Sequence, residues 1–201
     1  MNSRTEDDPN VVALEVLDLL ATASQSAAVQ AAALGPVPSD RFSVLTRHIG
    51  YPEFAAFGAF HDRVLVGFAY GARCAPGQWW FDQISPTLVA NGHRAWLSDS
   101  HAVTELHVLP RHQGTGVGFR LLTALLSDVG AARVLLSTYD NESAARRFYR
   151  RLGFRDLVTG FRFQVTPQPF ALMGATLPLV LDLTAVPGSS VEMPQPAAEP
   201  S

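Results

Sequence analysis

Apolar and polar positions alternate over residues 103–108, with one irregular step, and the alternation predicts a strand. Pro110 ends this strand because a proline has no N–H to donate to a neighbouring strand. After Phe119, apolar side chains recur at helical spacing over residues 122–129, which predicts an amphipathic helix. The sequence therefore predicts a strand, a short connection and a helix over these residues.

The connection between the two elements is rich in glycine, with Gly114, Gly116 and Gly118 at alternate positions. Glycine permits a positive φ and lets backbone N–H groups approach a ligand closely. The N-terminus of a helix also carries free N–H donors and partial positive charge, so we expect the turn to bind a diphosphate. The spacing is not the Gly-x-Gly-x-x-Gly of dinucleotide folds, and no Gly-Lys-Ser/Thr follows. An ordinary strand-to-helix turn remains the alternative.

A second segment separates these alternatives. After Gln113-x-x-Gly116-x-Gly118 come a predicted strand, then Asn141, then Phe-Tyr-x-x-Leu-Gly-Phe over residues 148–154. This combination, in this order, resembles the acyl-CoA-binding core of the GNAT superfamily of N-acetyltransferases, and the match covers about residues 103–157. The resemblance implies an α/β (α+β) domain whose mixed, mostly antiparallel central sheet is flanked by helices and splayed at the acyl-CoA site.

The resemblance also implies acetyl-CoA as cosubstrate and no metal. The pyrophosphate would meet the N–H groups of residues 113–118, and the backbone of residues 106–108 would pair with the pantetheine arm. Gln113 stands where many relatives have arginine, with Arg111 or Arg120 as possible compensation, and Asn141 could equally cap the following helix. The cofactor-binding residues implied are Leu106, His107, Val108, Gln113, Gly114, Thr115, Gly116, Val117, Gly118, Asn141 and Tyr149.

Transfer of an acetyl group to an amine needs a base for the amine, a donor for the oxyanion and an acid for the departing thiolate. Tyr149 is the candidate acid, since a phenol remains protonated at neutral pH; its alternative role is core packing. Glu105 is the first candidate base, directly or through water, because partial burial would raise its pKa. His107 is the second candidate base, because it lies two residues after Glu105 on the same face of the predicted strand. The N–H of Val108 could meet the oxyanion.

Alternative interpretations of Glu105 and His107 remain open, because polar residues on a half-exposed strand need no catalytic role and some relatives use water as the base. An acceptor pocket is predicted at Trp79, Trp80, Phe81 and Asp82, whose aromatic walls and carboxylate would suit an amine cation. The alternative is that these four residues anchor the segment 75–102, which corresponds to a variable insertion of the family, to the core. The arginines within residues 146–151 are expected to form a solvated face.

The reaction implied is direct transfer of the acetyl group to a primary amine of a small molecule or peptide in a ternary complex. The alternatives are a catalytically degenerate acyl-CoA-binding sensor or interaction protein, and a turn that binds another phosphorylated ligand. With 15 basic and 18 acidic side chains, the chain has a net charge of −3, which predicts no nucleic-acid partner. No stretch resembles a membrane span or signal peptide, so a cytoplasmic protein is expected, with a homodimer plausible by family habit.

The 201 residues, 47% of them hydrophobic, suffice for one core, so residues 11–184 are predicted to form a single domain. Cys74, the single cysteine, is expected to be a buried apolar residue. Tails are predicted at residues 1–10 and, rich in proline, at residues 185–201. The remaining elements are predicted as helices over 14–34, 41–50 and within 85–97, a hairpin of 55–60 with 64–73, and terminal strands over 161–165 and 170–183.

Overall fold

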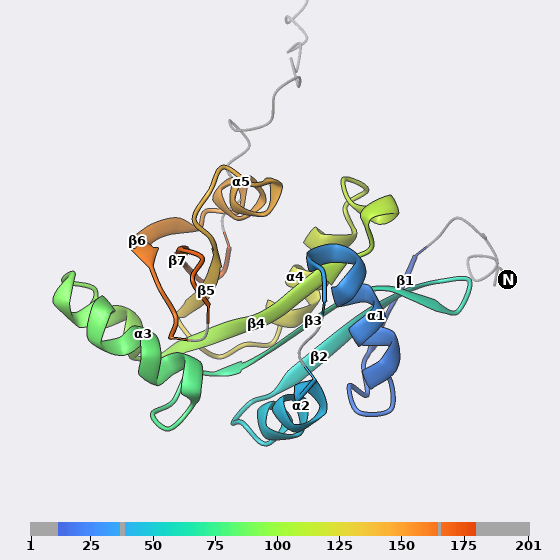
Figure 1. The fold of residues 1–201 in the computed structure, drawn as a ribbon, viewed down its shortest axis with the longest axis horizontal. Coiled ribbons are helices and arrows are strands. Elements are labelled where there is room, and N and C mark those ends of the chain that lie inside the picture. The colour runs from blue at the N-terminus through green and yellow to red at the C-terminus, as the bar shows by residue number, and fades with distance from the viewer. Residues whose placement is uncertain (1–11, 37–38, 165, 180–201) are drawn as a thin grey trace, which may run out of the picture.

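The computed structural model describes residues 12–36, 39–164 and 166–179, which fold as a sheet flanked by helices (Figure 1). The strands are β1 (Ala13–Val16), β2 (Ala55–His61), β3 (Val64–Arg73), β4 (Ser100–Val108), β5 (Arg133–Tyr139), β6 (Arg155–Phe161) and β7 (Phe170–Thr176). The helices are α1 (Ala23–Leu34), α2 (Arg41–Ile49), α3 (Trp79–Ala90), α4 (Val117–Leu126) and α5 (Ala144–Arg151), with short 3₁₀ turns at Arg94–Leu97 and Pro110–His112.

The seven strands lie in the order β1-β2-β3-β4-β5-β7-β6. All neighbouring pairs are antiparallel except β4 and β5, which are parallel. These two strands pair only where residues 100–102 meet residues 133–135, and the rest of β4 has no partner on that side. The predicted sheet, mixed, mostly antiparallel and splayed, is thereby confirmed.

A bulge in β4 explains the irregular step in its sequence pattern. Tyr70 of β3 lies opposite Glu105, but the next residue, Gly71, lies opposite Val103, so Thr104 is the extra residue. The extra residue changes the alternation, and Val103 therefore joins the same core as Leu106 and its neighbours. A Cβ at Gly71 would lie 2.2 Å from a backbone oxygen of β4, so the bulge requires glycine there.

The helices cover both faces of the sheet. Leucines of α4 and aromatic residues of α5 pack with β5 and β7 in one core, while α1 and α2 pack over Phe68 and Tyr70 of β3 in a second. A third cluster lies between α3 and β5, β6 and β7. Figure 1 shows α1 and α2 over β2 and β3, with α3 and α5 beside β5 to β7. The helix predicted over 122–129 occurs as α4 with its apolar side buried, but it begins earlier, at Val117, and ends at Leu126.

Several predicted elements need correction. The helix predicted over 14–34 begins only at Ala23, because residues 13–16 pair with β2 as an edge strand. The helix expected within 85–97 starts earlier, at Trp79, and tolerates Pro86. Of the strand expected at 161–165 only Phe161 is in a strand, as the last residue of β6, while residues 162–164 are irregular and residue 165 lies outside the described residues. The strand expected over 170–183 stops at Thr176, just before Pro178, and its residues 180–183 lie outside the described residues. The helix at 41–50 and the hairpin are confirmed. The predicted tails, 1–10 and 185–201, lie outside the described residues.

His101 of β4 is the most isolated buried polar side chain of the described sheet. It is completely buried, and neither ring nitrogen has a hydrogen-bond partner among the described residues. Burial lowers its pKa from 6.5 to about 4, because the charged imidazolium would lose its hydration. The native state therefore holds His101 neutral at pH values where the unfolded chain protonates it.

We predict that this histidine destabilises the protein in mild acid. Between the unfolded pKa of 6.5 and the folded pKa of about 4 the unfolded state binds the extra proton, so stability falls as the pH falls through this window. From pH 7 to pH 5 the loss should be about 1–2 kcal/mol. Urea unfolding of the wild type and of His101→Leu at both pH values measures it. An equal loss in both proteins would contradict the prediction.

Candidate active site

A cleft of about 600 Å³ opens between the free edge of β4, the glycine-rich turn and α5. Its position coincides with the divergence of β4 from β5. Most of its lining side chains are apolar. The lining residues are Leu106, Val108, Gln113, Gly114, Gly116, Gly118, Phe119, Ala144, Ala145, Phe148, Tyr149, Arg151 and Leu152.

The glycine-rich turn has the backbone conformation that its sequence predicts. Gly114 has φ 77° and Gly116 has φ 87°, and Gly116 is the N-cap of α4. A Cβ at either position would meet nothing within 4 Å, so the left-handed backbone, rather than crowding, favours glycine there. Gly118 differs, because it lies in the first turn of α4 against Phe148, 3.8 Å from its would-be Cβ. The first N–H groups of α4 thus lie beside an open cleft.

Two side-chain hydrogen bonds stabilise this turn, and one of them joins it to β4. The hydroxyl of Thr115 donates to the carbonyl of His112 at 2.7 Å, and the amide of Gln113 donates to the carbonyl of Val108 at 3.0 Å. Gln113 therefore supports the loop from within, a role that its sequence position did not reveal. Arg111 donates a hydrogen bond from Nε to the ring of its neighbour His112. Neither Arg111 nor Arg120, the two arginines expected to compensate for Gln113, lines the cleft.

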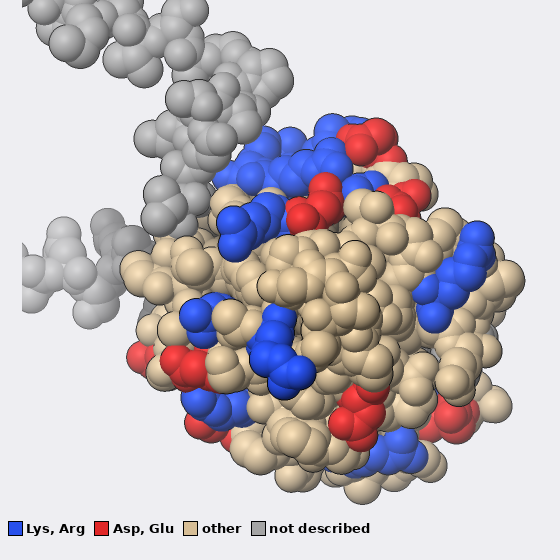
Figure 2. Space-filling view, turned by 90° about the vertical axis from the view of Figure 1, so that its left-hand side faces the viewer, with Lys and Arg blue, Asp and Glu red and all other residues tan. Residues whose placement is uncertain are grey.

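The structure places an arginine at the cleft that the sequence analysis missed. Arg151, at the end of α5, is exposed and lines the cleft. Its neighbour Arg146 contradicts the predicted solvated face, because it is buried and ion-paired to Asp140 at 2.5 Å and Asp156 at 3.1 Å. Figure 2 shows charged side chains gathered at the top of the molecule, where Figure 1 places α5. The signal available in the sequence was helical spacing, which separates Arg151 from Arg146.

Asn141 does not cap α5. The N-cap is Ser143, whose hydroxyl accepts a hydrogen bond from the N–H of Arg146 at 3.1 Å. The capping alternative for Asn141 is therefore wrong, and Asn141 is also not among the residues that line the cleft. Its contact with a cofactor stays a prediction.

Tyr149 lies in the wall of the cleft and is almost completely buried. Its ring packs edge-on against Phe148 and Phe154, with centroids 5.2 and 5.5 Å away. Burial raises the pKa of Tyr149, because the phenolate would lose its hydration. The ring thus packs in the core, as the packing interpretation predicts, and the role of Tyr149 as an acid stays a prediction.

Glu105 and His107 share one face of β4, as predicted, and the cleft-lining Leu106 lies between them in the chain. The Glu105 carboxylate lies 3.5 Å from Nε2 of His107 and 3.2 Å from the guanidinium of Arg41, at the start of α2. Arg41 is itself buried and also donates to Gln30 of α1. The spacing of β4 predicted the pair of Glu105 and His107, but Arg41, far away in sequence, could not be found from it.

The expected rise in the pKa of Glu105 is wrong. Burial on its own would raise that pKa, but the hydrogen bond from His107 and the charge of Arg41 outweigh it and hold the pKa below its ordinary value. Glu105 is therefore ionised at neutral pH and strongly paired. A proton that reaches this carboxylate needs an onward route.

The aromatic segment at the start of α3 has structural contacts. Trp79 stacks on Phe163 with centroids 5.6 Å apart, and the indole of Trp80 donates to Ser137 at 3.1 Å. Phe81 is buried, and Asp82 accepts from the N–H of Gly77. None of the four predicted acceptor residues lines the cleft described above. Their role in acceptor binding stays a prediction, and these contacts match the anchoring alternative.

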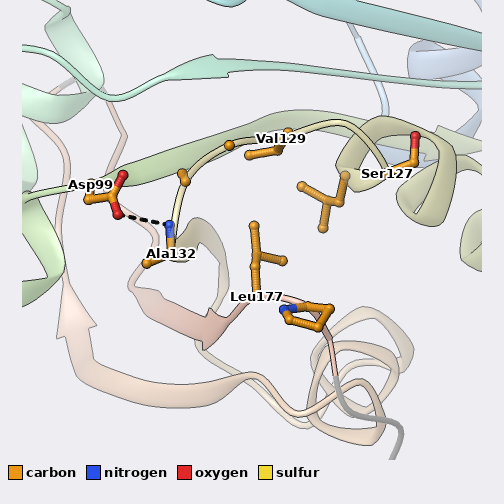
Figure 3. Close-up of a pocket in the computed structure, with 9 residues that line it drawn as sticks. Asp99, Ser127, Val129, Ala132 and Leu177 are labelled. Atoms are coloured by element: carbon orange, nitrogen blue, oxygen red, sulfur yellow. Dashed lines mark hydrogen bonds between the residues drawn. The ribbon is translucent and has the colours of Figure 1, made fainter.

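A second, smaller hollow of about 300 Å³ lies between the α4–β5 connection and Leu177 (Figure 3). Its one charged lining residue, Asp99, accepts from the N–H of Ala132 and is ion-paired to Arg73 at 2.8 Å. This hollow thus offers no free reactive group. Within residues 12–36, 39–164 and 166–179, no group of His, Cys, Asp or Glu side chains could hold a metal ion. No helix in this described part is long and apolar enough to cross a membrane.

Comparison with known proteins agrees with this geometry. The family model described as the acetyltransferase (GNAT) family matches residues 27–154, and the chain belongs to that family. It is similar to the GCN5-like protein acetyltransferase Rv2170 of Mycobacterium tuberculosis, with 44% identity over 123 residues. That alignment covers 57% of this chain and 60% of the relative, so the chain matches less than two thirds of the relative's length.

Solved structures show the same fold. Ard1 from Thermoplasma volcanium aligns with a TM-score of 0.62 and 16% identity, over 82% of this chain and 97% of that one. The putative acetyltransferase yncA from Salmonella typhimurium, solved with its cofactor acetyl-CoA, aligns with a TM-score of 0.56 and 17% identity. This second alignment covers 84% of this chain and 95% of that chain.

We predict that Arg41 sets the ionisation of Glu105. In Arg41→Gln the carboxylate loses its buried cationic partner, so its pKa should rise, and the variant should melt at a lower temperature because a partly buried charge is left unpaired. Carbon-13 NMR titration of the glutamate carboxyls measures the shift. Arg47→Gln, which removes an exposed arginine from the same helix, is the control. An unchanged Glu105 titration in Arg41→Gln would contradict the assignment.

Proposed function

We propose that the protein transfers the acetyl group of acetyl-CoA to a primary amine of a protein or peptide. The observation that carries the proposal is one cleft that joins a helix N-terminus, a free strand edge and a buried phenol. These groups match in turn the diphosphate, the amide-bearing arm and the thioester sulfur of acetyl-CoA. We also propose that residues 11–184 act as a single domain.

The fit to acetyl-CoA rests on groups that lie free in the cleft. The N–H groups around Gly116 would receive the diphosphate. The edge at residues 106–108 has no strand partner on that side and would pair with the pantetheine amides, although its Val108 carbonyl already accepts from Gln113. Arg151 would supply the cation that Gln113 lacks. The thioester carbonyl would then lie near the point where β4 and β5 diverge.

The chemistry needs no covalent intermediate. The amine would lose a proton to the pair formed by Glu105 and His107, attack the thioester carbonyl, and release the thiolate. Tyr149 would protonate the departing sulfur, because its phenol keeps its proton at neutral pH. The oxyanion would be met by a backbone N–H at the free edge of β4, with Val108 as the candidate.

A protein amine is the acceptor class that we favour, because the similar mycobacterial protein is described as a protein acetyltransferase. A small-molecule amine is the second candidate. The 201-residue sequence contains no lysine, since all 15 of its Lys and Arg residues are arginine, and this simplifies the test. Acetyl-lysine detected in a reaction therefore cannot come from acetylation of the 201 residues themselves.

The test is thiol release from acetyl-CoA in the presence of a pool of synthetic peptides with lysine side chains and free N-termini. Mass spectrometry of the peptides then identifies the acetylated nitrogen, and a parallel panel of small amines covers the second candidate. Calorimetry on the same preparation measures acetyl-CoA binding. Acetyl-CoA binding and peptide acetylation support the proposal. Binding without acetylation of any acceptor favours the sensor alternative, and no binding overturns the cofactor assignment.

We predict that Gly116→Glu abolishes acetyl-CoA binding. The substitution places a carboxylate at the N-terminus of α4, where the diphosphate would lie, and a side chain at φ 87° strains the turn. Calorimetry should show at least a hundredfold loss of affinity. Gly92→Glu is the matched control, because Gly92 has φ 78°, equally open surroundings and no place in the cleft. Equal affinity losses in the two variants would argue against diphosphate binding at the turn.

Tyr149→Phe should lower kcat about tenfold to a hundredfold and leave acetyl-CoA affinity nearly unchanged, since only the proton donor is lost while the ring packing is kept. Steady-state thiol release and calorimetry measure the two quantities. Tyr139→Phe, at an exposed tyrosine outside the cleft lining, controls for loss of a hydroxyl. An unchanged kcat in Tyr149→Phe would remove Tyr149 as the acid.

A further inference from the structure

A line of hydrogen-bonding side chains runs from Glu105 toward the surface through the core of the protein. Tyr70 lies directly opposite Glu105 on β3, so the two side chains project from the same face of neighbouring strands. The hydroxyl of Tyr70 lies 3.1 Å from Nδ1 of His48 on α2. Tyr70 is completely buried, whereas His48 is partly exposed. The line therefore connects the candidate base to solvent through a region that excludes water.

We propose that Tyr70 and His48 form a proton relay that carries the proton of the acceptor amine from Glu105 to solvent. The inference rests on the proposed acetyltransferase function and deepens it. It assigns two relay residues on the side of the sheet opposite α4, where neither lines the cleft. Their sequence surroundings contain no motif that points to such a role.

The transfer balances without any further reactant. An N–H bond of the amine breaks as an O–H bond forms on Glu105. That proton then passes to the hydroxyl oxygen of Tyr70 while Tyr70 gives its own proton to Nδ1 of His48. The imidazolium releases a proton to water from Nε2, which leaves His48 with its proton on Nδ1. Proton exchange with water then returns His48 to the Nε2–H tautomer, and rotation of the Tyr70 hydroxyl resets the line. Imidazole is ordinarily a stronger base than a carboxylate, so the proton moves toward His48.

The charged neighbours of the relay favour transfer of the proton to His48 over its retention on Glu105. Arg41 on α2 and His107 on β4 both stabilise the ionised form of Glu105, so the carboxylate does not retain a proton. Burial lowers the pKa of His48, with Glu105 opposing that shift and Arg47 and Arg41 adding to it, so the imidazole is neutral and able to accept. Tyr51 packs on the other side of His48, with ring centroids 5.3 Å apart.

Burial also raises the pKa of Tyr70 well above its ordinary value. A phenolate is therefore not formed at rest. Tyr70 can pass a proton only by receiving one as it gives one, which is the behaviour that a relay requires.

The experiment compares Tyr70→Phe and His48→Gln with wild type in acetyl-CoA-dependent acetylation of the peptide pool. Tyr70→Phe removes only an oxygen and keeps the packing against Phe68 and Phe54. We expect kcat to fall about tenfold in both variants and the solvent deuterium isotope effect on kcat to increase, because proton removal becomes slower. The KM for acetyl-CoA should be unchanged. Added imidazole should partly restore kcat in His48→Ala, since this position is reached by solvent.

The matched control is His61→Gln, which changes a partly exposed histidine outside the relay. It should leave kcat and the isotope effect unchanged. A structural role for Tyr70 or His48 would lower the melting temperature without altering the isotope effect and without rescue by imidazole. That result, or folded variants with wild-type kcat, would overturn the relay.

A second readout separates failure of the relay from failure of the proposed function. If wild type acetylates no acceptor, the function fails, and nitrogen-15 NMR of the histidines still tests the relay. In wild type the Nδ1 signal of His48 should respond when Glu105 is protonated, and Tyr70→Phe should weaken this response to the direct electrostatic effect of the Glu105 charge. Identical His48 titrations in the two proteins would overturn the relay whatever the activity.

Discussion

The brevity of the pairing between β4 and β5 is the constraint on which the rest of the structure depends. Two parallel strands that paired along their whole length would satisfy each other's backbone groups and leave no cleft. Here the pairing stops after residue 102, and a bulge at Thr104 immediately follows. A free backbone edge is ordinarily a liability, because unpaired N–H and carbonyl groups invite another strand. This edge is flanked by the turn before α4 and by α5, and our proposal places the amide-bearing arm of acetyl-CoA along it.

The bulge has a second consequence for the chemistry. Because it shifts the alternation of β4, Leu106 faces the cleft while Glu105 and His107 face α2. Groups that would bind a cofactor and groups that would handle protons thus occupy opposite sides of one strand. This separation lets the buried charges be paired without crowding the cleft. An uncompensated buried carboxylate would be costly, and Arg41 offsets that cost.

Features that depend on neighbouring residues in the chain could be predicted from the sequence, whereas contacts between residues far apart in the chain could not. The turn with Gly114 and Gly116 was predictable, because positive φ and helix entry are local properties. Tyr149 was predictable from a motif. Arg41 was not, since its partner is 64 positions away and no periodicity links them. The direction of the pKa of Glu105 was also beyond reach, because it depends on that partner. The family resemblance supplied the mixed, mostly antiparallel and splayed sheet, which no local pattern contains, whereas the strand order came only from the structure.

The buried network around α5 shows why the position of the candidate acid depends on residues that touch no ligand. Arg146 joins the end of β5, through Asp140, to β6, through Asp156. Tyr149 lies three positions further along the same helix, and its hydroxyl has no hydrogen-bond partner among the described residues. Its orientation therefore comes from ring packing and from the way the ion pairs hold the helix. A cleft lined mostly by apolar side chains keeps the phenol protonated, and a rigid helix keeps it in place.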